Sequence, residues 1–255
     1  MRATVGRTYL NKVAVPLRNV SSVTINIYRV ASPDSAPLEG TPKPGHRENY
    51  ARTNRAALCD LLVELGPDQP TLCTGWTTRD LAAHLVVRER RPDAAAGILI
   101  KGLSGYRKRV EQRMAARPFE KVVAKLRRPP LLSLSGIGPL DRMANTLEMF
   151  IHLEDVRRAQ PTWQPRPLPR GLGEALWRAT RVNARLTLRR FKAAVVLAAP
   201  EYGEVRVGAG DALVRVSGDP GELAIFMTGR QRAARVEVTG PEELVDKLRN
   251  KRLGV

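Results

Sequence analysis

The sequence predicts an α+β protein, with a helical region over residues 47–190 followed by a small α/β region over residues 191–255. Apolar residues recur at helical spacing as far as Phe191, whereas short apolar runs broken by Gly and Pro follow Lys192. This change of period predicts a domain boundary near residue 190. A chain of 255 residues is long enough to hold one large domain or two small ones.

The first 46 residues are expected to lie outside the folded part. They show little periodicity, few acids and several prolines, and their apolar stretches are too short for a secretory signal. We predict a disordered N-terminal extension over residues 1–46, with His46 as an exposed linker residue.

The helical region is expected to open with a helix that Gly66-Pro67 ends. A loop then leads into a second helix, for which Thr77 or Thr78 can serve as the cap and Asp80 is favourably placed in the first turn. Trp76, in the loop, is interpreted as a packing residue that positions this second helix.

The remaining elements follow from the same patterns. Further helices are predicted near 93–101, 119–126, 145–158 and 171–191, with a flexible connector at 129–139. The pair Gly136-x-Gly138 in that connector is too weak a signal for a phosphate-binding loop. Strands are predicted at 193–198, 204–207, 212–216 and 235–239, and helices at 219–227 and 241–251.

The helix predicted at Asn145–Arg158 carries a polar line through apolar surroundings. Its polar residues are spaced three or four apart and therefore share one face: Asn145, Glu148, His152 and Asp155. A helix that is apolar on nearly every other side should be buried, and burying a carboxylate with an imidazole is costly unless the charge is compensated. A metal ion would compensate it, and a simple His–Glu hydrogen bond or a solvated face is the alternative.

A third ligand for such a metal is available in the second helix. His84 lies on or beside the buried face of that helix, where a lone His is commonly a core residue. Two of the three histidines nevertheless lie in apolar helices that could face each other, which favours a metal. Asp155 could orient His152, or it could pair with Arg158 on its own helix.

Composition limits the classes of function. Two cysteines, Cys59 and Cys73, do not form a disulfide framework, so we expect a reducing cytoplasm and treat both as packed side chains rather than ligands. No apolar run is long enough to span a membrane. The net charge of +18 invites a nucleic-acid hypothesis, but the basic residues are scattered along helices without aromatic interleaving, so specific nucleic-acid binding is the weaker alternative.

Two motifs carry a resemblance to a known family. The segment CTGWTTRDLAAHL, followed later by LEMFIHLEDVRRA, resembles the mycothiol-dependent maleylpyruvate isomerases, a branch of the DinB/YfiT-like metal-binding helical bundles. The resemblance covers roughly residues 47–250 and implies a DinB-like four-helix bundle. Its GW-x-x-x-D-L-x-x-H pattern and later Glu–His pair imply that His84, Glu148 and His152 bind a divalent metal, expected to be zinc.

The C-terminal segment resembles the small α/β domain of the same family, which is akin to sterol carrier proteins. The matching stretches begin at Gly218-Asp219-Pro220 and include Thr228-Gly229-Arg230. The resemblance implies mycothiol as thiol cosubstrate for an isomerisation or thiol transfer. Arg230, and more weakly Arg88, are the candidate cationic groups for an electrophilic, anionic substrate.

Two rival functions remain open at this point. One is a non-catalytic metal-binding or stress-associated protein built on the same bundle. The other is a basic nucleic-acid-associated protein in which the three ligands form only a polar core.

Overall fold

The computed structural model describes residues 49–95, 104–130 and 139–254 of the chain. The predicted N-terminal extension at 1–46, with His46, and the pair Gly136-x-Gly138 lie outside these ranges, as does most of the helix predicted at 93–101. Within them, no helix is long and apolar enough to cross a membrane.

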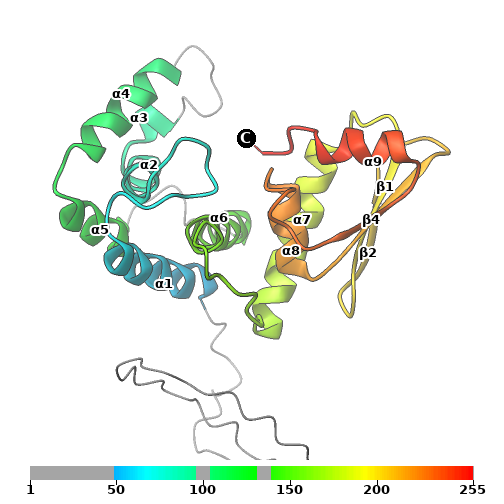
Figure 1. The fold of residues 1–255 in the computed structure, drawn as a ribbon, viewed down its shortest axis with the longest axis horizontal. Helices are drawn as coiled ribbons and strands as arrows, with labels where there is room; N and C mark the ends of the chain where they lie inside the picture. The colour runs from blue at the N-terminus through cyan, green and yellow to red at the C-terminus, as the bar shows by residue number, and fades with distance from the viewer. Residues whose placement is uncertain (1–48, 96–103, 131–138, 255) are drawn as a thin grey trace, which may run out of the picture. The chain divides into compact units, whose positions relative to one another are not determined.

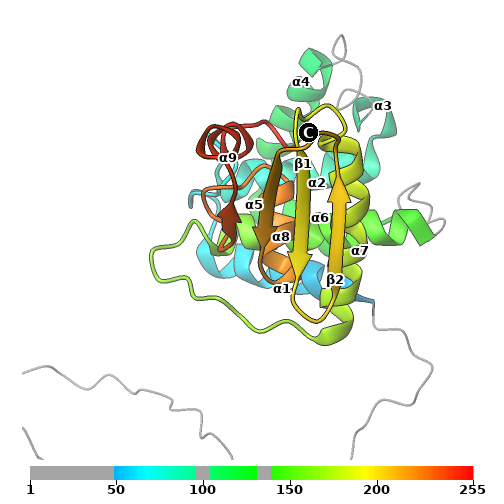
Figure 2. The same ribbon diagram turned by 90° about the vertical axis from the view of Figure 1, so that its right-hand side faces the viewer.

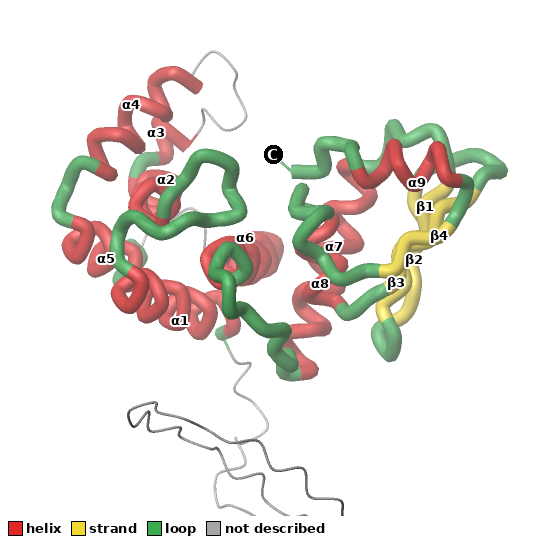
Figure 3. Tube along the Cα trace, viewed as in Figure 1, coloured by secondary structure: helices red, strands yellow, loops and turns green. Residues whose placement is uncertain are grey.

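Helices make up the first part of the fold, and a sheet with its covering helices makes up the second (Figures 1 and 3). The helices of the first part are α1 (Tyr50–Leu65), α2 (Thr78–Arg90), α3 (Pro92–Ala95), α4 (Ser104–Ala115), α5 (Phe119–Arg127) and α6 (Pro139–Arg157). The elements of the second part are α7 (Arg170–Thr187), β1 (Ala194–Ala199), β2 (Gly203–Val207), β3 (Leu213–Ser217), α8 (Pro220–Met227), β4 (Glu237–Thr239) and α9 (Glu242–Arg249).

The prediction of a mixed α+β chain is confirmed. The largest error among the predicted elements is the omission of α4. No helix was expected at Ser104–Ala115, because charged residues occupy much of this segment and leave little apolar periodicity. The central helix α6 begins at Pro139 rather than Asn145, since Pro is well tolerated in a first helical turn. Helix α7 ends at Thr187, four residues before the predicted end.

Local sequence signals define the ends of the first two helices. The side chain of Asn49 caps α1 by accepting a hydrogen bond from the Arg52 amide, and Gly66 ends the helix with a positive φ of 79°. At the start of α2 the Thr77 amide donates to the Asp80 carboxylate over 3.0 Å, as one half of a capping box. Of the two residues considered for the cap, Thr77 and Thr78, it is Thr77 that holds this position.

Helices α1, α2, α5 and α6 enclose a common apolar core. Its largest fully buried members are Leu58, Leu62, Leu81, Leu85, Leu126 and Met149. Beside it lies a buried ion pair in which Arg55 of α1 donates to both oxygens of Glu89 on α2. Arg55 also donates to the carbonyl of Leu126 over 3.1 Å, so one side chain connects three helices.

The sheet has the strand order β2-β1-β3-β4 and is seen face-on in Figure 2. Strand β1 pairs parallel with β3, whereas β1–β2 and β3–β4 are antiparallel. Alternate strand residues form one core with side chains of α7, α8 and α9, including Trp177 and Ala184 of α7, Phe226 of α8 and Leu248 of α9. A domain boundary near residue 190 stays a prediction.

Candidate metal centre

Three side chains predicted to bind metal lie together. His84 comes from α2, and Glu148 and His152 come from successive turns of α6. One nitrogen of each His and a carboxylate oxygen of Glu148 all lie within 4.8 Å of one another. The Nε2 atom of His152 is 3.3 Å from Oε1 of Glu148, and both histidines are about nine-tenths buried at 8 % exposure.

The second nitrogen of each histidine is held by a carboxylate. Nδ1 of His84 lies 2.8 Å from Oε1 of Glu111 on α4, and Nδ1 of His152 lies 2.9 Å from Oδ2 of Asp155. A carboxylate that accepts the Nδ1 proton fixes the tautomer and leaves Nε2 as the free donor of an electron pair. This arrangement is the usual one around histidines that bind metals.

The distances within the cluster suit a small divalent cation. Zinc binds nitrogen and oxygen at about 2.0–2.2 Å, so tetrahedral ligand atoms stand about 3.4 Å apart. The 3.3 Å between His152 and Glu148 already has this length, and a separation of up to 4.8 Å for His84 requires only a small movement. The described residues thus fit a His₂Glu set of ligands for such a cation.

The electrostatics of the cluster favour a cation between its carboxylates. Burial acts to raise the pKa of Glu148, but the hydrogen bond to His152 and the charges of Arg88 and His84 outweigh it and lower that pKa to about 2. Burial likewise acts to lower the pKa of His152, yet its contacts with Asp155, Cys73 and Glu148 raise it well above the usual value. A metal would supply the same positive charge as the proton on His152.

Both arginines proposed for a substrate lie beside the cluster. Nε of Arg88 lies 3.2 Å from Oε1 of Glu148, so Arg88 contacts a ligand directly. Arg230 donates to both oxygens of Asp155, over 2.8 and 2.7 Å, and to the carbonyl of Thr228. Arg230 is therefore joined to His152 through Asp155, and the substrate-binding role of either arginine stays a prediction.

Asp155 orients His152, one of the two roles considered for it. Arg158 does not pair with Asp155 but with Glu154 on α6 and Glu222 on α8, at 2.8 and 2.6 Å. Helical spacing would allow either pair, and Asp155 is not available to Arg158 because its carboxylate contacts His152 and Arg230.

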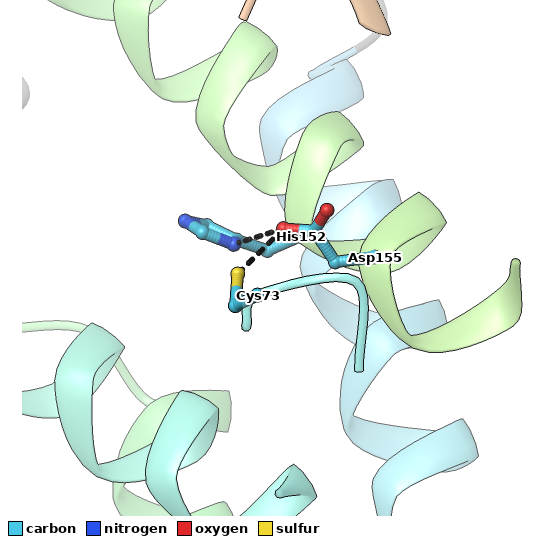
Figure 4. Close-up of side chains that lie close together, drawn as sticks. All are labelled: Cys73, His152 and Asp155. Carbon is cyan, nitrogen blue, oxygen red and sulfur yellow. Dashed lines mark hydrogen bonds and ion pairs between the residues drawn. The ribbon is translucent and has the colours of Figure 1, made fainter. Parts of the chain in front are cut away.

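Cys73 belongs to this polar cluster, contrary to the expectation that it only fills space. Its thiol donates to Oδ2 of Asp155 over 3.3 Å, and Nη2 of Arg230 approaches its sulfur at 3.4 Å. Figure 4 shows the thiol and the His152 ring meeting at the same Asp155 carboxylate. Cys73, His152 and Asp155 form a second group whose ligand atoms lie within 4.8 Å of one another, and it shares His152 with the first.

The loop before α2 is tied to α6 and packs on the cluster. The Leu72 amide donates to the carbonyl of Asp155 over 3.0 Å, which places Cys73 next to that carboxylate. The Trp76 ring lies 4.9 Å from the His84 ring between centroids, and Trp76 packs on the apolar core. Its expected packing role fits this position.

Two cluster residues could not have been assigned from the sequence. Glu111 lies in a helix with little apolar periodicity, and only its fold brings it to His84. Cys73 lies in a loop, so no helical spacing relates it to Asp155. The only available signal was the position of Cys73 directly before the GW pattern of α2.

The two cysteines are expected to react very differently. Burial raises the pKa of the Cys59 thiol to about 11, and its side chain has no exposed surface, whereas Cys73 is half-buried. We expect iodoacetamide to give a single adduct at Cys73 in the native protein and to reach Cys59 only after unfolding. Intact-mass measurements on the wild type and on Cys73→Ser check this, and modification of native Cys73→Ser would contradict it.

Comparison with known proteins gives a fold-level likeness. No family model matches the sequence, and no curated protein matches it. Solved structures that match include the crystal structure of the mycothiol-dependent maleylpyruvate isomerase and that of a histidine-to-alanine mutant of it. Each is 16 % identical in sequence to this chain, and each match covers 74 % of this chain and 90 % of the chain in the solved structure. The TM-scores are 0.46 for the isomerase and 0.51 for its mutant. The likeness to the mutant structure shows a distant relationship of fold.

Proposed function

We propose that the protein is a metal-dependent enzyme that activates a low-molecular-weight thiol, mycothiol in the first instance, for an isomerisation or a thiol transfer. His84, Glu148 and His152 hold the metal, with zinc as the expected ion. The observation that carries the proposal is the pair of histidines, each with Nδ1 held by a carboxylate and Nε2 left for the metal.

Two histidines and one carboxylate leave at least one metal position for a further ligand, which is typical of catalytic rather than structural zinc sites. When bound, the metal supplies a positive charge that lowers the pKa of a coordinated thiol, so that a thiolate is available at neutral pH. The surrounding residues fix the ligands, because both histidines are buried and the histidines with their carboxylate partners come from three different helices, α2, α4 and α6.

The arginines supply the positive charge that an anionic, electrophilic substrate requires. Arg230 is held rigidly by Asp155 and lies on the side of the cluster where Cys73 is found. A DinB-like bundle over residues 47–190, joined to a sterol-carrier-like α/β domain over residues 191–255, is the proposed architecture. A thiol cosubstrate of this class fits a reducing cytoplasm.

Thiol binding can be tested by absorption spectroscopy on the protein loaded with cobalt. Cys73 lies so close to His152 that it could itself bind cobalt, so the measurement is made in the Cys73→Ser variant. Addition of mycothiol is expected to produce a thiolate-to-cobalt charge-transfer band, whereas its S-methyl derivative should produce none.

The control outcomes distinguish the proposal from its rivals. A cobalt–thiolate band in the wild type before any thiol is added, lost in Cys73→Ser, would mean that Cys73 closes the site. No band on adding mycothiol to a cobalt-loaded site would also contradict the proposal. Either result would support the second candidate, a non-catalytic metal-binding protein, which the existing ion pairs of Arg88 and Arg230 favour.

A further inference from the structure

A cavity lined by cationic residues lies next to the Arg230 loop and the C-terminal segment. Its volume is about 390 Å³, and the described residues that line it include no acid. The cationic residues around it are Arg230, Arg232, Arg249, Lys251 and Arg252. A cavity surrounded by one sign of charge concentrates the opposite sign, because the field of each group adds to the others.

Residues 229–233 and residues 249–252 form most of the cavity wall. Close backbone packing holds these two segments together. Gly229, with a φ of 94°, lies so near Gly254 that an added Cβ would meet the Gly254 amide nitrogen at 3.0 Å. The Gln231 side chain donates to the carbonyl of Lys251 over 2.5 Å, and Leu253 is buried in the sheet core. The cavity is therefore preorganised, although it opens to solvent.

Arg230 is paired with Asp155, but three other arginines of this cavity have no acidic partner within the described part of the chain. Among the residues that the structure describes, Arg232, Arg249 and Arg252 form no ion pair, and all three are exposed. Arg249 near the C-terminus of α9 also interacts favourably with the helix dipole, but Arg232 and Arg252 lie outside that helix. The dipole therefore does not account for the cluster.

We propose that this cavity binds the phosphate group of a small molecule. A carboxylate is satisfied by one arginine fork, whereas a phosphate carries up to two negative charges and three acceptor oxygens, which several cationic groups can share. Inorganic phosphate, pyrophosphate and phosphate esters share this chemistry. The inference does not depend on the proposed function, since no metal ligand lines the cavity.

Contacts between side chains connect this cavity to the candidate metal centre. Arg230 lines the cavity and holds Asp155, which in turn holds His152. A phosphate in the cavity would attract the guanidinium of Arg230, which also holds the Asp155 carboxylate. Phosphate binding and metal binding are therefore expected to influence each other.

The test is isothermal titration calorimetry with inorganic phosphate, pyrophosphate and malonate, on full-length protein treated with a chelator so that no metal binds the anion. The pocket variant is Arg249→Gln/Arg252→Gln. The matched control is Arg185→Gln/Arg189→Gln, which removes the same charge from exposed residues that do not line the cavity. We expect the pocket variant to weaken pyrophosphate binding at least about tenfold and the control to change it less than about twofold.

Every other result overturns the assignment. Absence of binding to the wild type, or equal weakening in both double variants, would mean a general effect of a basic surface. Tighter binding of malonate than of pyrophosphate would assign the cavity to carboxylates. Salt-sensitive binding of duplex DNA that is lost in the pocket variant, without pyrophosphate binding, would make this face a nucleic-acid surface. Metal content is measured separately, and a wild type without metal would contradict the proposed function without deciding whether this cavity binds phosphate.

Discussion

Purified wild-type protein is expected to contain about one equivalent of a divalent metal, and His84→Ala is expected to contain almost none. His84 is the ligand that α2 contributes, so its loss leaves only Glu148 and His152 from a single helix. Two ligands one turn apart bind a metal far more weakly than three that converge from two helices. Mass spectrometry of protein purified without chelators, scanned for zinc, iron, manganese and cobalt, measures both the amount and the identity of the metal.

A graded effect is expected for the residue behind His84. Glu111→Gln keeps an acceptor near Nδ1 but removes its charge, so we expect metal affinity to fall about 10–100-fold with the site still formed. The matched control is Glu120→Gln, which changes an exposed carboxylate on α5. A wild type that neither contains metal nor takes it up from added zinc would show that the cluster is only a polar core.

Loss of Arg55 is expected to destabilise the fold by about 3–5 kcal/mol. Arg55→Ala removes the partner of a carboxylate that is only 3 % exposed at the Glu89 side chain, and it also removes the donor to the Leu126 carbonyl. The cost arises because Glu89 is left charged in a buried position. Urea unfolding followed by circular dichroism measures the change, which corresponds to a melting temperature lower by roughly 10 °C for a chain of this size.

Two further variants separate the cost of leaving Glu89 buried without a partner from the net contribution of the Arg55–Glu89 pair to the free energy of unfolding. Arg55→Met/Glu89→Leu replaces both charges by apolar groups, so its stability should lie much closer to the wild type than that of Arg55→Ala. Arg127→Gln breaks the exposed pair with Asp60 and should cost less than about 1 kcal/mol. Equal losses in the single and the double Arg55 variants would show that unpaired charge is not the cause.

Elements with strong local signals could be predicted from the sequence, and those that depend on packing could not. Helix α1 follows from its spacing and from Gly66, and the start of α2 follows from Thr77 and Asp80. Helix α4 could not be predicted, because charged residues interrupt its apolar spacing and only a few of its side chains, such as Val110, face a core. It is stabilised by neighbouring helices rather than by its own periodicity.

The candidate site divides in the same way. The sequence by itself determined Glu148 and His152 as neighbours, because residues four apart on one helix must share a face. That His84 meets them, that Glu111 holds His84, and that Cys73 and Arg230 meet at Asp155 were decided only by the tertiary structure. The physical reason is that helical spacing relates residues within one turn or two, whereas contacts between helices depend on how their apolar faces pack and on where the loops between them lie.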